Sequence, residues 1–190
     1  VVLITGASSG VGAALAGKLA GMGARVVVNY SRSAEAAQAV VSHITSAGGQ
    51  ALAVQADVSE EADCKQLVAA TIEQFGQLDA LVNNAGTTTF VPHDQLDDLT
   101  EDIWLRTLKV NLVGAFMMSR AVAPHIEAAG GGEIVMTSSI ASVTANGSSI
   151  AYCASKAGLN SLTRTLAKTL GKQNVRVNAV LPGLIDGDWA

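Results

Sequence analysis

VVLITGASSGVG, residues 1–12, joins a short apolar run to a glycine-rich turn that leads into an alanine- and leucine-rich segment. A turn of this kind between a strand and a helix is typical of phosphate binding, because the helix N-terminus offers amide donors and a partial positive charge. Gly6 would permit the tight turn, Gly10 the approach of a pyrophosphate, and Gly12 close packing of the helix on the sheet. The G-x-x-x-G-x-G spacing departs from the commonest fingerprint, and a small-residue turn without a ligand is the alternative.

The alternation of short apolar runs and longer helical segments continues along the whole chain. Strands are predicted over six runs rich in valine, isoleucine and leucine: 1–5, 24–29, 51–56, 78–82, 133–137 and 175–180. Helices are predicted over 10–22, 34–47, 60–75, 100–129 and 150–171. Strands without polar alternation indicate a parallel sheet that is buried on both faces and connected by right-handed crossovers. We therefore predict one doubly wound α/β domain over residues 1–190, with helices on both faces of the sheet.

The composition is that of a compact globular domain. Hydrophobic residues make up 49% of the 190 residues and charged residues 15%, which is enough apolar material for a substantial core. The formal net charge of −4 and the pI near 5.3 argue against nucleic acid or an acidic membrane surface as a partner, since both require a basic face. No apolar run approaches the ~18 residues of a membrane helix.

Cysteine and histidine positions argue against a disulfide framework and a metal site. Cys64 and Cys153 are isolated in the sequence, which is typical of reduced thiols in a cytoplasmic protein. The histidines lie at spacings that do not form a ligand set: His43, His93 and His125. The chain opens at Val1 inside an apolar run, so we expect the native N-terminus to be missing, and a lost targeting segment is left open.

The segment after the second predicted strand bears on which dinucleotide would bind. An acid at this place would accept from the ribose 2′-hydroxyl of NAD, whereas an arginine accommodates the 2′-phosphate of NADP. Residues 29–33 read NYSRS, and the first acid is Glu35, inside the next helix. Arg32 therefore favours NADP over NAD, with a solvated loop arginine as the alternative.

Two further turns follow strands at the same edge of the predicted sheet. Asp57 and Val58 come after the third strand, where a carboxylate would accept from an adenine amino group. The sequence NNAG at residues 83–86 follows the fourth strand, and its small residues would let a ribose lie against the backbone. The alternative is an asparagine-rich turn that only ends the strand.

Tyr152 and Lys156 form a Tyr-x-x-x-Lys pair at the start of the last predicted helix. Residues at i and i+4 share a helix face. A nearby ammonium would favour the phenolate and lower the tyrosine pKa from about 10, as proton transfer near neutral pH requires. Ser139, in the preceding loop, could hydrogen-bond the same substrate oxygen. Taken alone, such a pair is also common on ordinary surface helices.

Taken together, these residues resemble those of the short-chain dehydrogenase/reductase family. The resemblance covers nearly the whole chain in order, and it includes the thirteen-residue step from Ser139 to Tyr152. Around NYSRS and residues 130–185 the chain is most similar to the 3-oxoacyl-[acyl-carrier-protein] reductase-like branch. The resemblance to the family rests on TGASSGVG at 5–12, NNAG at 83–86, Asn111, Ser139, Tyr152, Lys156, Pro182 and Gly183. The family implies a Rossmann fold with strand order 3-2-1-4-5-6 and NAD(P) as cofactor.

The resemblance also implies a role for each matching residue. Tyr152 would be the general acid/base, Lys156 would lower its pKa and hold the nicotinamide ribose, and Ser139 would polarise the carbonyl. Asn111 would anchor a water that links Lys156 to solvent. The expected cofactor contacts, to which Tyr152 and Lys156 also belong, are Gly6, Ser8, Ser9, Gly10, Val11, Gly12, Arg32, Asp57, Val58, Asn84, Ala85, Gly86, Val110, Pro182, Gly183 and Ile185.

The sequence departs from the family pattern in two places. Gly187 stands where the family usually has a threonine that meets the nicotinamide carboxamide. The chain stops at Ala190, whereas the family continues into a substrate-covering helical loop, a further helix and a seventh strand. We therefore expect the C-terminal substrate-loop and last-strand region to be lacking, which bears on both turnover and substrate choice.

The predicted helix 100–129 indicates an oligomer. Its apolar residues occur on every side, and a helix that is apolar all round is buried all round. One side must face the sheet, so the other would face a second subunit, together with helix 150–171. The family resemblance likewise implies a homodimer or homotetramer. The alternative is that a C-terminal segment covers this surface. Pro124 is expected to bend or end the regular part of the helix.

These features predict an NADPH-preferring reductase that interconverts a ketone and a secondary alcohol, with NAD as the other cofactor candidate. The expected partner is a small carbonyl or alcohol substrate, with no nucleic acid, membrane or metal. Two alternatives keep the fold. One is a dinucleotide-binding regulator or scaffold with little turnover, and the other is an isomerase or dehydratase.

Overall fold

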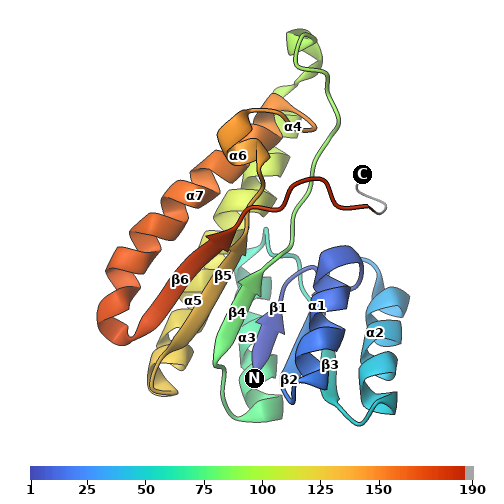
Figure 1. Cartoon of the computed structure of the whole chain (residues 1–190), viewed down its shortest axis with the longest axis vertical. Helices are drawn as coiled ribbons and strands as arrows, with labels where there is room; N and C mark the ends of the chain where they lie inside the picture. The colour runs from blue at the N-terminus through green and yellow to red at the C-terminus, as the bar shows by residue number, and fades with distance from the viewer. Residues whose placement is uncertain (187–190) are drawn as a thin grey trace.

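The computed structural model describes residues 1–186 and contains a single parallel sheet. Six strands lie in the order β3-β2-β1-β4-β5-β6 (Figure 1), which confirms the predicted topology. The strands are β1 (Val2–Ile4), β2 (Arg25–Tyr30), β3 (Gln50–Gln55), β4 (Ala80–Asn83), β5 (Gly132–Thr137) and β6 (Val175–Val180). The order changes direction between β1 and β4, the switch point at which ligands of open α/β sheets bind.

Helices cover both faces of this sheet. The longer helices are α1 (Gly10–Gly21), α2 (Ala34–Ser46), α3 (Glu61–Phe75), α4 (Glu101–Leu108), α5 (Ala115–Ala128) and α7 (Ile150–Leu170). Short helical segments are η1 (Leu96–Asp98), η2 (Lys109–Gly114), α6 (Ala141–Thr144) and η3 (Gly171–Gln173). In Figure 1, η1 lies at the top of the molecule, above the end of the sheet that carries α6 and the start of α7.

Two neighbouring residues of β1 show how the strand alternation builds two cores. Ile4 is fully buried in a cluster with alanines and aliphatic residues of α1 and α2. Leu3 is fully buried in the opposite cluster, with side chains of α3, α5 and α7. Successive strand residues point to opposite faces, so an unbroken apolar run is what a sheet covered on both sides requires.

The predicted helix 100–129 is interrupted. The π-helical segment η2 separates α4 from α5 and carries Asn111. Such segments are rare and are frequently found at functional sites. Pro124 does not end the helix, because α5 continues to Ala128.

The helical surface on this side is partly exposed in the single chain, as expected of a surface that a second subunit or a C-terminal segment would cover. Leu105, Val113 and Phe116 are 57%, 43% and 38% exposed. Of the helices in residues 1–186, none combines the length and the apolar character needed to cross a membrane.

Candidate active site

The glycine-rich turn lies between β1 and α1 and is pressed against the turn that follows β4. Gly6 has φ +61°, and a Cβ there would lie 2.8 Å from Cα of Ala85. A Cβ on Gly12 would lie 2.6 Å from Nδ2 of Asn84 and 2.7 Å from the carbonyl of Gly6. Both positions therefore require glycine.

Gly10 differs from these two glycines. It has φ +53°, but a Cβ at this position would meet no atom within 4 Å, and the residue is exposed. Ser8, Ser9 and Val11 surround it at the N-terminus of α1, where Ser9 and Val11 are exposed and Ser8 is half-buried. The backbone at the helix start is thus open on one side, as a cradle for a pyrophosphate requires.

Side chains from three strands hold this turn. The Thr5 hydroxyl accepts hydrogen bonds of 3.0 Å from the backbone amides of Asn84 and Ala85. The side-chain amide of Asn84 donates in return to the carbonyls of Thr5 and Gly6, at 3.0 Å each. Asn29, buried at the end of β2, accepts from the Gly6 amide at 3.1 Å. The side-chain nitrogen of Asn84 thus fixes the turn, and the contact of this residue with the cofactor stays a prediction.

Thr5 and Asn29 were not singled out from the sequence. The one available signal for Asn29 was a polar residue inside the apolar run of β2. Gly86, which follows Ala85 in the same turn, is half-buried.

Asp57 lies just after β3, at the same edge of the sheet. It accepts from the backbone amide and hydroxyl of Ser59, at 2.9 and 2.6 Å, and lies 3.6 Å from Arg106 of α4. Burial would raise the pKa of Asp57, but the bonds from Ser59 and the Arg106 guanidinium outweigh it and hold the pKa below its usual value. Asp57 is therefore a carboxylate at neutral pH and can accept from a ligand. Arg106 was not predicted from the sequence.

The other predicted cofactor residues fall into two groups. Val58 and Val110 are 6% exposed and belong to the core. Arg32 is exposed after β2. Gly183 and Ile185 are exposed in the segment after β6, where the Pro182 carbonyl accepts from the Ile140 amide at 2.9 Å. Gly187 lies outside the described residues.

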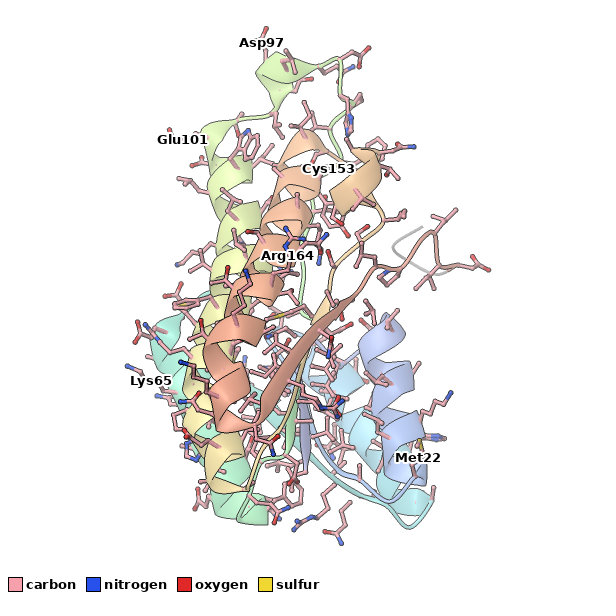
Figure 2. All side chains as sticks on the ribbon, turned by 60° about the vertical axis from the view of Figure 1, so that its left-hand side comes forward. Met22, Lys65, Asp97, Glu101, Cys153 and Arg164 are labelled. Carbon is pink, nitrogen blue, oxygen red and sulfur yellow. The ribbon has the colours of Figure 1, made fainter. Side chains whose placement is uncertain are left out.

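Helix α7 delivers Tyr152 and Lys156 to this edge. Ser149 is its N-cap, since its hydroxyl accepts from the Tyr152 amide at 3.2 Å. Figure 2 shows Cys153, the neighbour of Tyr152, near the end of the molecule that also carries Asp97 and Glu101. The two predicted catalytic residues thus lie within the first two turns of α7.

Lys156 is buried against β5. It is 4% exposed, and its ammonium nitrogen donates to the carbonyl of Thr137 at 2.7 Å. The nitrogen lies 5.6 Å from the centroid of the Tyr152 ring. Burial lowers the pKa of Lys156 from 10.5 to about 8. This lysine is therefore the most strongly desolvated cation near the candidate site.

The expected lowering of the Tyr152 pKa is wrong for this structure. Burial raises the pKa of the phenol above 10.0, a hydrogen bond with the Ser139 side chain lowers it in part, and Cys153 raises it slightly. Helix spacing brings Lys156 close, but the desolvation of the phenol outweighs the benefit of a hydrogen-bond donor. The structure does bring Ser139 and Tyr152 together.

Asn111 joins the π-helical segment to α7 and to the turn after β4. Its side-chain oxygen accepts from the Thr87 amide at 2.7 Å. Its nitrogen donates to the Thr87 carbonyl at 2.9 Å and to the Ser155 hydroxyl at 3.0 Å. Ser155, which is fully buried, donates to the Tyr152 carbonyl at 2.7 Å. The water-binding role that the family implies for Asn111 remains a prediction.

No group of three or more candidate ligand side chains that could hold a metal ion occurs within residues 1–186. Both cysteines are buried free thiols. Burial raises the pKa of Cys64 to about 11, and burial likewise raises the pKa of Cys153, so neither is an activated nucleophile.

Comparisons with known proteins identify the family of the chain. The family model described as short chain dehydrogenase matches residues 1–190. The 3-oxoacyl-[acyl-carrier-protein] reductase of a Synechocystis species is 42% identical over 190 residues, covering 99% of this chain and 75% of the relative. The L-rhamnose 1-dehydrogenase (NAD(P)(+)) of a Sphingomonas species is 42% identical over 185 residues, covering 97% and 72%.

Solved structures agree with the fold. A Burkholderia xenovorans structure assigned to the short-chain dehydrogenases/reductases superposes with a TM-score of 0.95 at 37% identity, covering 98% of this chain and 78% of the other. Sequence and fold thus agree over nearly the full length of the chain. The chain belongs to the short-chain dehydrogenase/reductase family of NAD(P)-dependent oxidoreductases that act on carbonyl and alcohol substrates.

Proposed function

We propose that this protein is an NADPH-dependent carbonyl reductase with Tyr152 as its general acid. The observation that carries the proposal is the convergence of three side chains at one edge of the sheet. Ser139 hydrogen-bonds to Tyr152, and the Lys156 ammonium lies 5.6 Å from the Tyr152 ring. A phenol, a hydroxyl and an ammonium at one place can protonate and stabilise a developing alkoxide.

Each side chain then has a separate task. Tyr152 donates its phenolic proton to the substrate oxygen as the carbonyl becomes an alcohol, and takes it back in the reverse direction. A pKa raised by burial keeps the phenol protonated, which suits an acid in the direction of reduction. Ser139 donates a hydrogen bond to the same oxygen. Lys156 holds positive charge beside the phenolate that remains. It would also hydrogen-bond the ribose hydroxyls of the cofactor.

The cradle of Gly6, Gly10 and Gly12 would hold the pyrophosphate of the cofactor, and Asp57 would accept from its adenine amino group. When bound, the nicotinamide supplies the hydride to the substrate carbon. Arg32, exposed after β2, supports NADP over NAD because a guanidinium pairs with a 2′-phosphate, whereas an acid there would favour NAD.

The substrate is proposed as a small ketone and its secondary alcohol. The names of relatives span acyl, sugar and steroid substrates, among them the 7alpha-hydroxysteroid dehydrogenase of Bacteroides fragilis. The proposal is therefore confined to the reacting carbonyl/alcohol pair that these names share.

We also propose a homodimer or homotetramer built on helices 100–129 and 150–171. Leu105, Val113 and Phe116 leave a row of apolar side chains exposed on α4, η2 and α5. Burying such a row against a second copy would remove apolar area from water. A cytoplasmic location is proposed because Cys64 and Cys153 are free thiols.

The test is incubation with NADPH or NADH and a panel of ketones, following the loss of nicotinamide absorbance and the products. Consumption of NADPH with one alcohol formed for each cofactor oxidised supports the proposal. Tight NADPH binding with no product from any ketone would instead indicate a dinucleotide-binding regulator. Product formed without net cofactor consumption would indicate an isomerase or dehydratase.

A further inference from the structure

A chain of hydrogen bonds links the segment after β5, which carries Ser139, to α7 one turn beyond Lys156. The Asn160 amide nitrogen donates to the Ser142 hydroxyl at 2.7 Å. The Ser142 hydroxyl donates in turn to the carbonyl of Ser139 at 2.5 Å. We propose that Asn160 and Ser142 are positioning residues for Ser139, which fix its hydroxyl relative to Tyr152. The proposal rests on the role of Ser139 in the proposed reductase.

The direction of these bonds follows from what each group can donate. A carbonyl only accepts, so the Ser142 hydroxyl donates its single proton to the Ser139 carbonyl. The Ser142 hydroxyl oxygen must then accept its other hydrogen bond from Asn160. This assigns the side-chain nitrogen of Asn160 to the Ser142 side. Replacing either residue would therefore break the whole link.

The same geometry prepares the Ser139 hydroxyl. Its oxygen accepts from the Ala141 amide at 3.1 Å, while the Ser142 amide donates to the Ser139 carbonyl at 3.0 Å. These are the contacts of a serine that begins a helical turn. The Ser139 hydroxyl acts only as an acceptor toward Ala141. Its proton therefore stays available for a hydrogen bond to Tyr152 or to a substrate oxygen.

The Asn160–Ser142 link is one of three connections between α7 and three consecutive residues, the last of β5 and the two that follow it. Lys156 donates from its ammonium to the Thr137 carbonyl, and the Ser138 hydroxyl donates to the Lys156 carbonyl at 3.3 Å. The third connection runs from Asn160 through Ser142 to Ser139. Tyr152 and Lys156 lie on α7, and Ser139 is fixed to the same helix by these bonds. Attachment to one rigid element keeps the groups of a site in a productive geometry.

Asn160 carries a cost that points to a role beyond packing. Its side-chain oxygen is buried and has no hydrogen-bond partner among residues 1–186. An unsatisfied buried acceptor destabilises the folded state, and an apolar residue of the same size would avoid this. Violations of such local rules are expected at functional sites.

The test uses Asn160→Leu, Ser142→Ala and their double variant, with Ser142→Thr as the conservative variant and Ser161→Ala as the matched control. Ser161 is exposed and next to Asn160 on α7. We expect kcat to fall about tenfold in each of the first three, which corresponds to one hydrogen bond of positioning, with no additivity in the double variant. The KM for NADPH, the Ser142→Thr activity and the Ser161→Ala activity should stay near wild type. The thermal stability of Asn160→Leu should be equal to or above that of wild type.

A second readout does not depend on turnover. The chain has two tyrosines, so the ultraviolet titration of wild type minus that of Tyr152→Phe isolates the Tyr152 phenol. Titratable groups near it are Lys156 and Cys153, and His93 bonds the Gly147 carbonyl in the loop before α7. All of these stay in place in the variants. Since the Ser139 hydrogen bond favours the phenolate, its loss in Asn160→Leu and Ser142→Ala should raise the phenol pKa.

The two readouts separate the possible failures. A wild-type kcat and an unchanged phenol titration in Asn160→Leu would overturn the proposal, as would equal falls in kcat, cofactor affinity and thermal stability. If wild type reduces no ketone, the proposed function fails, while the titration still decides whether Asn160 controls the Ser139–Tyr152 contact.

Discussion

The Lys156 ammonium lies 5.6 Å from the centre of the Tyr152 ring and is held there by the carbonyl of Thr137, 2.7 Å away. The anchor belongs to β5 and the helix is α7, so the pair is positioned by tertiary structure as well as by helical spacing. Lys156 therefore keeps a fixed place near the phenol while its other donors point elsewhere.

Tyr152→Phe should abolish turnover without removing the cofactor site. The ring remains to fill its space, but the proton donor is lost, which lowers kcat by about 10²- to 10⁴-fold. NADPH affinity, measured by fluorescence titration, should stay within about threefold, since the proposed pyrophosphate contacts come from the glycine turn rather than from Tyr152. Substantial residual activity would remove Tyr152 from its proposed role.

Lys156→Met should reveal the cost of burying an ammonium. Burial places the Lys156 pKa at about 8, below the 10.5 of an exposed lysine. Between these values the unfolded chain binds more protons than the folded protein, so wild-type stability rises with pH across this window, and below it the penalty is complete. The Lys156→Met variant lacks the bond to Thr137 at every pH.

Urea unfolding of both proteins from neutral pH to about pH 10.5 measures this effect. We expect wild type to gain stability relative to Lys156→Met as the pH rises from about 8 to 10.5. A difference between the two proteins that does not vary with pH would show that Lys156 is not desolvated in solution.

Gly12→Ala should damage both the fold and cofactor binding. Its Cβ would lie 2.6 Å from the Asn84 amide and 2.7 Å from the Gly6 carbonyl, and such overpacking costs about 1–3 kcal/mol. Gly17→Ala is the matched control on the same helix, because a Cβ there meets nothing within 4 Å. It should stabilise the protein by up to about 1 kcal/mol, through helix propensity alone. Calorimetric melting and NADPH titration distinguish the two, and equal behaviour would contradict the cradle.

Arg32→Ala should weaken NADPH far more than NADH. The loss of one charge-assisted contact to a 2′-phosphate corresponds to about tenfold in affinity, while NADH should change by less than about twofold. The measurement is the ratio of kcat/KM for the two cofactors. Equal falls in kcat/KM for NADPH and NADH would show that Arg32 does not recognise the 2′-phosphate.

Phe116→Asp should reduce the molecular mass in solution. Phe116 is 38% exposed on α5, within the row proposed to meet a second copy, and a carboxylate there would lose its hydration in the interface. Arg120, whose guanidinium lies 5.5 Å from the Phe116 ring, already pairs with Glu61. Met22→Asp is the control, at a residue 74% exposed on the far side of the sheet near α1. Light scattering after gel filtration should show a smaller species for Phe116→Asp alone, and an unchanged mass would move the interface elsewhere.

The parallel sheet could be predicted because most of its strands are short apolar runs, and Leu3 and Ile4 do face opposite cores. β6 departs from this pattern, since VRVNAV begins with alternating buried and exposed residues. The strand order is predicted by the family resemblance rather than by the runs themselves. The break in the helix 100–129 could not. Apolar residues continue through Val110 to Val113, and the π-helical segment is tied by Asn111 to Thr87 and Ser155, which are far apart in the sequence.

The approach of Ser139 and Lys156 to Tyr152 was predicted, but the direction of the Tyr152 pKa shift was missed. The spacing of Tyr152 and Lys156 gives a shared helix face, but sequence spacing does not report how deeply each group is buried. Burial sets the direction of both pKa shifts. Support from Thr5, Ser142 and Asn160 was missed because polar side chains of this kind have no periodic pattern.

The hydroxyl of Thr5 and the amide of Asn84 are 79 residues apart along the chain. A nascent polypeptide released before β4 is synthesised would possess every glycine of the first turn and still be unable to shape it. The shape of the glycine turn thus depends on a strand from the middle of the sheet, so we expect nucleotide binding to require the chain to fold through β4.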